Sequence, residues 1–132
     1  LTSIGESAFE STTSLKTIDF KNVLTIGENA FENVNFKQLD TLKFNNKTTI
    51  KTEAFKNVKF KANAKIDFTN KNSTIGEKAF YGIKNVESIL NGNQVTSVGN
   101  KAFAKSSLSD NNLTKENTFP NATEFGNDVF AA

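Results

Sequence analysis

The sequence predicts a solenoid of stacked repeats, because one short sequence phrase occurs six times along its 132 residues. The phrase consists of isoleucine, glycine, two variable residues, alanine and phenylalanine, and residues 4–9 are its first copy. Successive copies are 22, 24, 25, 23 and 27 residues apart, measured between their phenylalanines. A period in this range is typical of arrays whose units bury their apolar faces against their neighbours. The phenylalanines, which we expect to fill the core, are Phe9, Phe31, Phe55, Phe80, Phe103 and Phe130.

A second phrase lies between the copies and predicts one short parallel strand per repeat. Its last two apolar residues are two apart, which is the period of a strand that buries one face. Val86 and Ile89 are a reduced fourth copy, and the turn signal of Asn91 and Gly92 ends that strand. Residues 106–118 are polar, so we expect a loop or a distorted repeat there. The fuller copies are Leu15, Ile18 and Phe20, then Leu39, Leu42 and Phe44, then Asn63, Ile66 and Phe68.

The first phrase predicts a bend followed by a helical turn on the opposite side of each repeat. Ile26, Ala30 and Phe31 are four and five residues apart. Gly27 lies between them, and glycine tolerates backbone angles that other residues reach only at a cost. Lys51 holds the same position in the third copy, so the bend does not require glycine there.

The two phrases together resemble the BspA-type leucine-rich repeat family, whose units follow the pattern V-x-x-I-G-x-x-A-F-x-x-C-x-x-L-x-x-I-x-I/F. The resemblance extends from Leu1 to Phe130. It implies a leucine-rich-repeat solenoid of five to six repeats, with one short parallel strand per repeat and turns or short helical segments on the opposite side. The position that is usually cysteine in the family holds small or branched residues here, namely Thr12, Val34, Val58, Ile83 and Ser106.

The resemblance also implies a protein that is secreted or displayed on a cell surface, where such arrays bind host or matrix proteins and partner cells. We therefore expect a non-catalytic, adhesion-type protein-binding module without a cofactor, located outside the cell and not inserted in the membrane. Two alternatives stay open. The repeats could be a structural spacer or stalk that projects another domain, or an intracellular scaffold, since a chain without cysteine suits both compartments.

The chain is expected to form a single solenoid segment over residues 1–132 and to be a fragment of a longer array. Leu1 falls inside a repeat, and the last residues follow directly after a copy of the first phrase. Terminal repeats without a polar cap expose part of their apolar face, and exposed apolar faces favour association. We therefore expect end-to-end self-association of the fragment through Leu1, Ile4 and Phe9 at one end and Phe125, Val129 and Phe130 at the other.

Composition argues against catalysis, metal binding and nucleic-acid binding. Histidine and cysteine are absent, which removes the commonest general base, the thiol nucleophile and the usual zinc ligands. Lysine supplies all 16 basic residues against 14 acidic ones, and the lysines are scattered along the chain. Nucleic-acid binding typically uses a basic stripe with arginine and exposed aromatic side chains, so we expect neither nucleic acid nor metal as a partner.

Alternation along the second phrase predicts a polar column on the outer face of the strands. If Ile18, Leu42 and Ile66 point inward, the residues beside them point outward. Neighbouring strands are about 4.8 Å apart, so outward charges of alternating sign would attract by roughly 0.2 to 1 kcal/mol per pair. Such a column serves equally well as a ladder that fixes the register or as a binding surface. The candidate protein-binding residues are Thr17, Asp19, Thr41, Lys43, Lys65 and Asp67.

Overall fold

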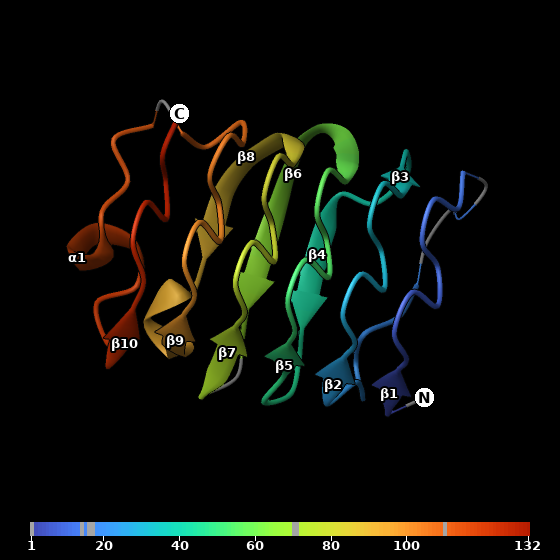
Figure 1. Ribbon diagram of the computed structural model, residues 1–132, viewed down its shortest axis with the longest axis horizontal. Helices are drawn as coiled ribbons and strands as arrows, with labels where there is room; N and C mark the ends of the chain where they lie inside the picture. Colours follow the sequence, from blue (N-terminus) through green and yellow to red (C-terminus); the bar gives the residue numbers. More distant parts are fainter. Residues whose placement is uncertain (1, 14, 16–17, 70–71, 110) are drawn as a thin grey trace.

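The computed structural model is a parallel solenoid in which the repeats stack along one axis from the N-terminal to the C-terminal end (Figure 1). It describes residues 2–13, 15, 18–69, 72–109 and 111–132. The solenoid predicted from the period of the sequence is confirmed, and the walls of the array are two parallel sheets and a series of tight turns.

The longer sheet takes one strand from each copy of the first phrase. Its six parallel strands follow the order β1-β2-β5-β7-β9-β10, so each strand pairs with the same position in the next repeat. The sequence predicts a bend here and does not predict these strands, because each has only two to four residues. The strands are β1 (Ser3–Ile4), β2 (Thr25–Ile26), β5 (Thr49–Ile50), β7 (Ser73–Ile75), β9 (Val95–Val98) and β10 (Glu124–Phe125).

The shorter sheet takes its strands from the second phrase and from the residues just before it. Its parallel strands are β3 (Asn35–Phe36), β4 (Thr41–Phe44), β6 (Lys59–Phe68) and β8 (Lys84–Leu90). The long strand β6 pairs with β3 and β4 on one side and with β8 on the other. The strand predicted around Ile18 and Phe20 is wrong, since residues 18–20 form no strand.

The turn predicted at Asn91 is confirmed, but the fourth strand, with seven residues, is longer than its reduced pattern indicated. Strand β8 ends at Leu90, and Asn91 adopts a left-handed φ of 58° before the short 3-10 helix η1 (Gly92–Gln94). The fifth copy forms no strand among its described residues. Instead it contains turns and the one-turn helix α1 (Lys115–Thr118), whose start is capped by mutual hydrogen bonds between Thr114 and Asn117.

In the first five copies of the first phrase, the residues that follow the glycine position form β-turns, where a helical turn was expected. The Ala30 N–H donates to the Gly27 carbonyl at 3.2 Å within the repeat, and the next N–H, of Phe31, donates to Ala54 of the following repeat at 2.7 Å. Asn29 has a φ of 58°, as the third residue of a type II turn requires. Because hydrogen bonds within and between repeats alternate along this segment, each repeat is joined to the next here as well as in the sheets.

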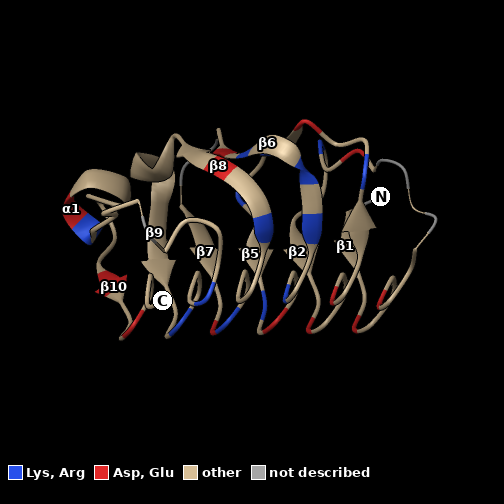
Figure 2. Ribbon diagram, turned by 90° about the horizontal axis from the view of Figure 1, so that it is seen from above, with Lys and Arg blue, Asp and Glu red and all other residues tan. Residues whose placement is uncertain are grey.

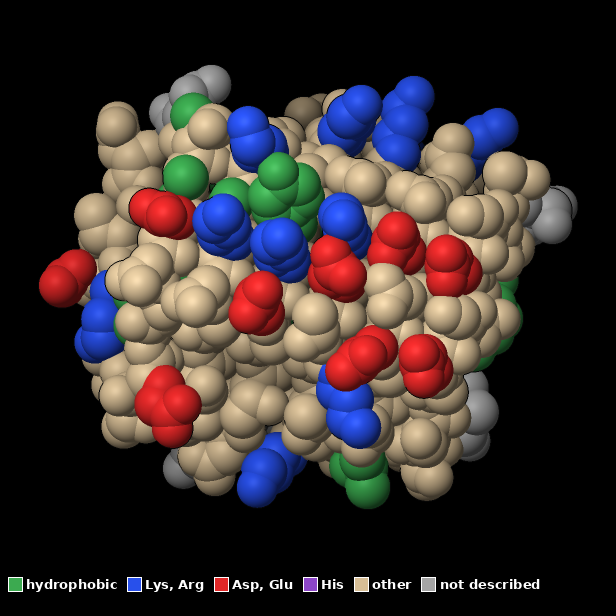
Figure 3. All heavy atoms as spheres, in the orientation of Figure 1, with side chains coloured by type: hydrophobic (Ala, Val, Ile, Leu, Met, Phe, Trp, Pro, Cys, Tyr) green, Lys and Arg blue, Asp and Glu red, His purple; other side chains and the backbone are tan. Residues whose placement is uncertain are grey.

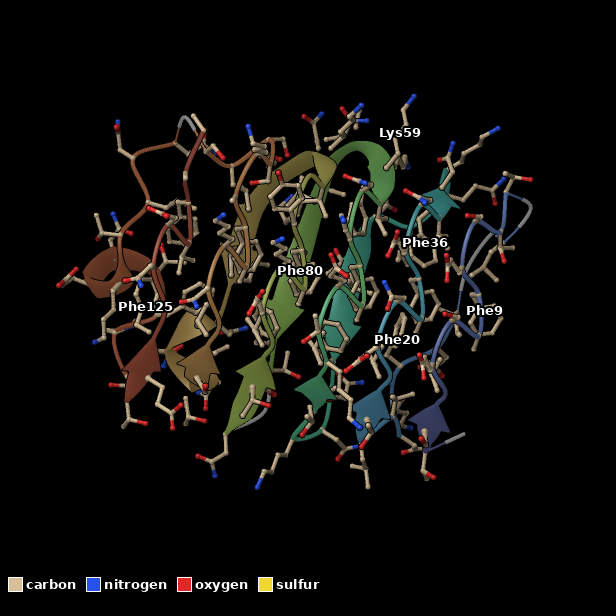
Figure 4. All side chains as sticks on the ribbon, viewed as in Figure 1. Phe9, Phe20, Phe36, Lys59, Phe80 and Phe125 are labelled. Atoms are coloured by element: carbon tan, nitrogen blue, oxygen red, sulfur yellow. The ribbon has the colours of Figure 1, made fainter. Side chains whose placement is uncertain are left out.

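Two stacked columns of phenylalanine fill the core, as predicted (Figure 4). In the first column the ring centroids of Phe31 and Phe55 are 5.1 Å apart, and those of Phe55 and Phe80 are 5.0 Å apart, with nearly parallel planes. The second column meets the first edge-on, for example Phe68 against Phe80 at 87°. Phe119, which follows α1, continues the second column next to Phe68, where the fourth repeat has Asn91 in place of a phenylalanine. The second column consists of Phe20, Phe44, Phe68 and Phe119.

The ends of the array are less exposed than the sequence suggested. Ile4 and Val129 are each 3% exposed, so their predicted exposure is wrong. Ile4 pairs with Ile26 in the longer sheet, and the Val129 carbonyl accepts a hydrogen bond from the Phe103 N–H. Phe9, Phe125 and Phe130 are half-buried, and Leu1 lies outside the described residues.

Candidate functional site

The outer face of the shorter sheet holds four of the six residues that sequence analysis proposed for binding. Leu42 and Ile66 are fully buried, which confirms the predicted alternation. Two rows of outward residues therefore cross β4, β6 and β8 at neighbouring positions. One row is Thr41, Lys65 and Ser88, and the other is Lys43, Asp67 and Leu90. We call these six residues the strand face.

The other two predicted residues are not part of this sheet. Asp19 is exposed in a segment without ladder hydrogen bonds, and its carboxylate accepts a hydrogen bond from the Lys21 N–H at 2.9 Å. Thr17 lies outside the described residues. The structure adds Ser88 and Leu90 to the face, although β8 shifts its register against β6 at two places.

Among the described residues, the charged side chains of the strand face form no close ion pair with one another. The Asp67 carboxylate accepts a hydrogen bond from the Asn91 side chain at 2.6 Å. The Lys65 ammonium lies 3.7 Å from the Glu87 carboxylate. Among the residues that the structure describes, Lys43 forms no ion pair. The row thus presents an unpaired ammonium, a carboxylate held in place by an amide, and the 37% exposed side chain of Leu90.

A hollow of about 340 Å³ borders the strand face at the place where a fifth strand would lie. Next to the lining residues Glu87 and Leu108 in the chain, the Ser107 hydroxyl accepts a hydrogen bond from the Val86 N–H at 3.0 Å and donates one to the Val86 carbonyl at 2.9 Å. Gly92 and Thr118 both line the hollow, and their backbones lie so close that a Cβ atom added at Gly92 would be 2.0 Å from the Thr118 carbonyl oxygen. The hollow has the volume of a small ligand pocket. Its apolar lining includes Ile89, Leu108 and Leu113, and its rim includes Asn91, Asn111 and Asn117.

The face formed by the turns carries charges that are partly paired within the chain (Figure 3). Acidic side chains gather toward the N-terminal repeats, and lysines lie beside them in the middle of the array. The Lys56 ammonium lies 3.0 Å from the Glu53 carboxylate and 5.8 Å from the centre of the Tyr81 ring. This hydrogen bond lowers the pKa of Glu53 and raises the pKa of Lys56. We interpret this group as local stabilisation of the turns.

In the described part of the chain, no three or more acidic side chains converge as metal ligands would. Within the same residues, no helix is both long and apolar enough to cross a bilayer.

The two parallel sheets, the hydrogen-bonded turns and the phenylalanine columns define a leucine-rich-repeat solenoid, a class of repeat protein that presents extended surfaces for binding other proteins and is typically non-catalytic. The chain belongs to the family described as the BspA type leucine rich repeat region, whose model matches residues 2–132 in six copies. No curated protein and no solved structure showed a significant match to the chain.

Proposed function

We propose that the chain is a non-catalytic, adhesion-type protein-binding module of a cell-surface or secreted protein, and that its strand face contacts the partner. The observation that supports this assignment is the row of Lys43, Asp67 and Leu90 at matched positions of three neighbouring strands. Membership of the family supports the role of a binding repeat.

Side chains of the strand face lose little conformational entropy when a partner binds, because the sheet already holds them in place. Backbone hydrogen bonds of the sheet hold Lys43 and Asp67, and Asn91 orients the Asp67 carboxylate further. Fewer rotatable groups are therefore immobilised when a partner binds, which leaves more of the contact energy for affinity. Exposed Leu90 adds apolar area beside the charges. A complementary partner would present an acidic group opposite Lys43 and an apolar side chain opposite Leu90.

Surface plasmon resonance on immobilised collagen, fibronectin and laminin tests this proposal. The double variant Lys43→Glu with Asp67→Lys reverses both charges and keeps the net charge. We expect it to weaken binding to the matrix protein that the parent chain binds by at least about tenfold, as loss of two contacts of about 0.7 kcal/mol each would do. Circular dichroism should show an unchanged fold.

Lys101→Glu with Asp128→Lys is the matched control, since both residues are exposed on the turns and the net charge is again unchanged. This variant should bind like the parent chain. If the control loses binding and the strand-face variant does not, the contact surface is the face formed by the turns.

The spacer function is the second candidate, and the continuous stacking of the array favours it. Hydrogen bonds join neighbouring repeats in both sheets and in the turns, which suits a stiff rod. If the parent chain binds none of the three matrix proteins, the spacer becomes the better assignment. An export signal in the neighbouring sequence would exclude the intracellular scaffold.

A further inference from the structure

Lysines that are scattered in the sequence lie together at the edge where the turns meet the shorter sheet. Strands β3, β6 and β8 begin at this edge, and their register aligns Asn35, Lys59 and Lys84 across three repeats. Lys37 and Lys61 each follow by one residue the paired positions of β3 and β6. We call Lys37, Lys59, Lys61 and Lys84 the lysine edge. Figure 2 shows basic residues at the start of β6 and β8, and Figure 4 shows Lys59 at this edge of the array.

The lysine edge carries more positive charge than its surroundings neutralise. All four side chains are exposed. The Lys61 ammonium lies 2.6 Å from the Asp40 carboxylate, and this hydrogen bond lowers the pKa of Asp40. In the part of the chain that the structure describes, Lys37, Lys59 and Lys84 form no ion pair. Three uncompensated ammonium groups therefore follow one another along three repeats.

This arrangement does not serve the stability of the sheet. Lys59 and Lys84 are directly opposed residues of neighbouring strands, and like charges in such positions disfavour pairing. Elsewhere in the same sheet, Lys65 of β6 and Glu87 of β8 carry opposite charges and lie close together. A bound anion would relieve the repulsion between Lys59 and Lys84, so the edge is electrostatically suited to an anionic ligand.

The spacing of the ammonium groups favours a linear polymer over a single small anion. Successive strands of a sheet are about 4.8 Å apart, so the starts of β3, β6 and β8 span roughly 10 Å. The aromatic residues of this edge, Phe36 and Phe60, are 0% and 2% exposed. Phe36 and Phe60 therefore offer nucleic-acid bases no surface on which to stack, whereas sulfate groups need only the positive charge.

We propose that the lysine edge binds a sulfated polysaccharide of the kind carried by cell surfaces and extracellular matrix. The extracellular setting rests on the proposed function, but the site is distinct from the strand face. A polymer with regularly spaced sulfates would lie across β3, β6 and β8 and contact Lys37, Lys59 and Lys84 in three successive repeats.

Binding to heparin, measured by isothermal titration calorimetry at several salt concentrations, tests the inference. The variant Lys59→Glu with Lys84→Glu should bind heparin at least tenfold more weakly. The slope of log affinity against log salt should fall by about 1.5, because each lost ammonium contact to a polyanion contributes roughly 0.7 to 0.9. Lys21→Glu with Lys47→Glu changes the net charge equally at exposed positions outside the edge and should retain most of the affinity. An equal loss in both variants would mean that net charge alone attracts heparin, and would overturn the site.

Two further probes identify the chemistry of the ligand. Heparin from which the sulfate groups have been removed should not bind, and binding that survives their removal would contradict the inference. A single-stranded oligonucleotide should bind more weakly than heparin of equal charge, and equal affinity would reassign the edge to nucleic acid. Binding of the Lys59 and Lys84 variant to the matrix proteins, and of the Lys43 and Asp67 variant to heparin, should equal that of the parent chain. Failure of one proposal is thereby distinguished from failure of the other.

Discussion

The two sheets of the solenoid come from two phrases of the same repeat. The phrase that forms the longer sheet varies less from repeat to repeat than the phrase that forms the shorter sheet. The longer sheet has a strand in all six repeats, whereas the shorter sheet has none among the described residues of the first repeat and ends at β8. In the longer sheet the backbones of neighbouring repeats come very close, since a Cβ atom added at Gly27 would lie 2.7 Å from the Glu6 nitrogen. This close stacking restricts which residues the first phrase can contain. The sequence of the shorter sheet is less restricted, and this sheet carries the strand face and the lysine edge.

Removing a ring from the first phenylalanine column should have the largest effect. Phe55 is fully buried between Phe31 and Phe80, so Phe55→Ala leaves a cavity in the middle of the stack. We expect the free energy of unfolding to fall by about 3 to 5 kcal/mol in urea denaturation. Ile89→Ala, on the half-buried end of the shorter sheet, should cost less. A loss below about 1 kcal/mol for Phe55→Ala would contradict the stacked core.

Adding a methyl group at a glycine that directly follows a strand of the longer sheet should have an intermediate effect on stability. A Cβ atom at Gly99 would lie 2.5 Å from the Glu77 nitrogen, so Gly99→Ala should destabilise the fold by about 1 to 3 kcal/mol. In the third repeat, Lys51 stands at the glycine position, and the hydrogen bond to the preceding repeat is slightly longer there. The distance from the Lys51 nitrogen to the Ile26 carbonyl oxygen is 3.0 Å, whereas that from the Gly99 nitrogen to the Ile75 carbonyl oxygen is 2.8 Å. Lys51→Ala is the control and should change stability by no more than about 0.5 kcal/mol. Equal thermal denaturation curves for the two variants would show that close stacking does not restrict the glycine positions.

Removing a side-chain hydrogen bond at the edge of β8, in the shorter sheet, should have the smallest effect on stability. The Ser107 hydroxyl bonds both the N–H and the carbonyl of Val86, so Ser107→Ala should cost about 1 kcal/mol and accelerate hydrogen exchange of the Val86 amide. Ser3→Ala, at an exposed position of β1, should leave that exchange rate unchanged. If the Val86 amide exchanges equally slowly without the hydroxyl, another group must cover the edge of β8.

The sequence was sufficient to predict the stacking and the core, because both depend on a period that is visible without the structure. The strands of the longer sheet were missed because their hydrogen bonds come from other repeats, and two residues such as Thr25 and Ile26 show no periodicity of their own. Phe119 was missed because it follows a polar segment and reaches the second column only through the path of the chain around α1.

Prediction of the surface was less complete than prediction of the core. Alternation placed Lys43 and Asp67 outward, but the side-chain partners of Asp67 depend on the turn at Asn91. The lysine edge escaped notice although Lys59 and Lys84 both lie four residues after a repeat phenylalanine. A position-by-position alignment of the repeats would have found it, whereas counting charges along the chain could not.

Alternating hydrogen bonds in the turns, together with those of the two sheets, connect neighbouring repeats along the axis of the array. A tensile force between the two ends would therefore be carried by the interfaces in series, and the weakest would open first. One released repeat of about 24 residues would lengthen the chain by roughly 80 Å when fully extended. Under tension the repeats would therefore unfold one after another, as in an extensible tether. Each unfolding step would lengthen the chain and delay the rise of force on the bound partner.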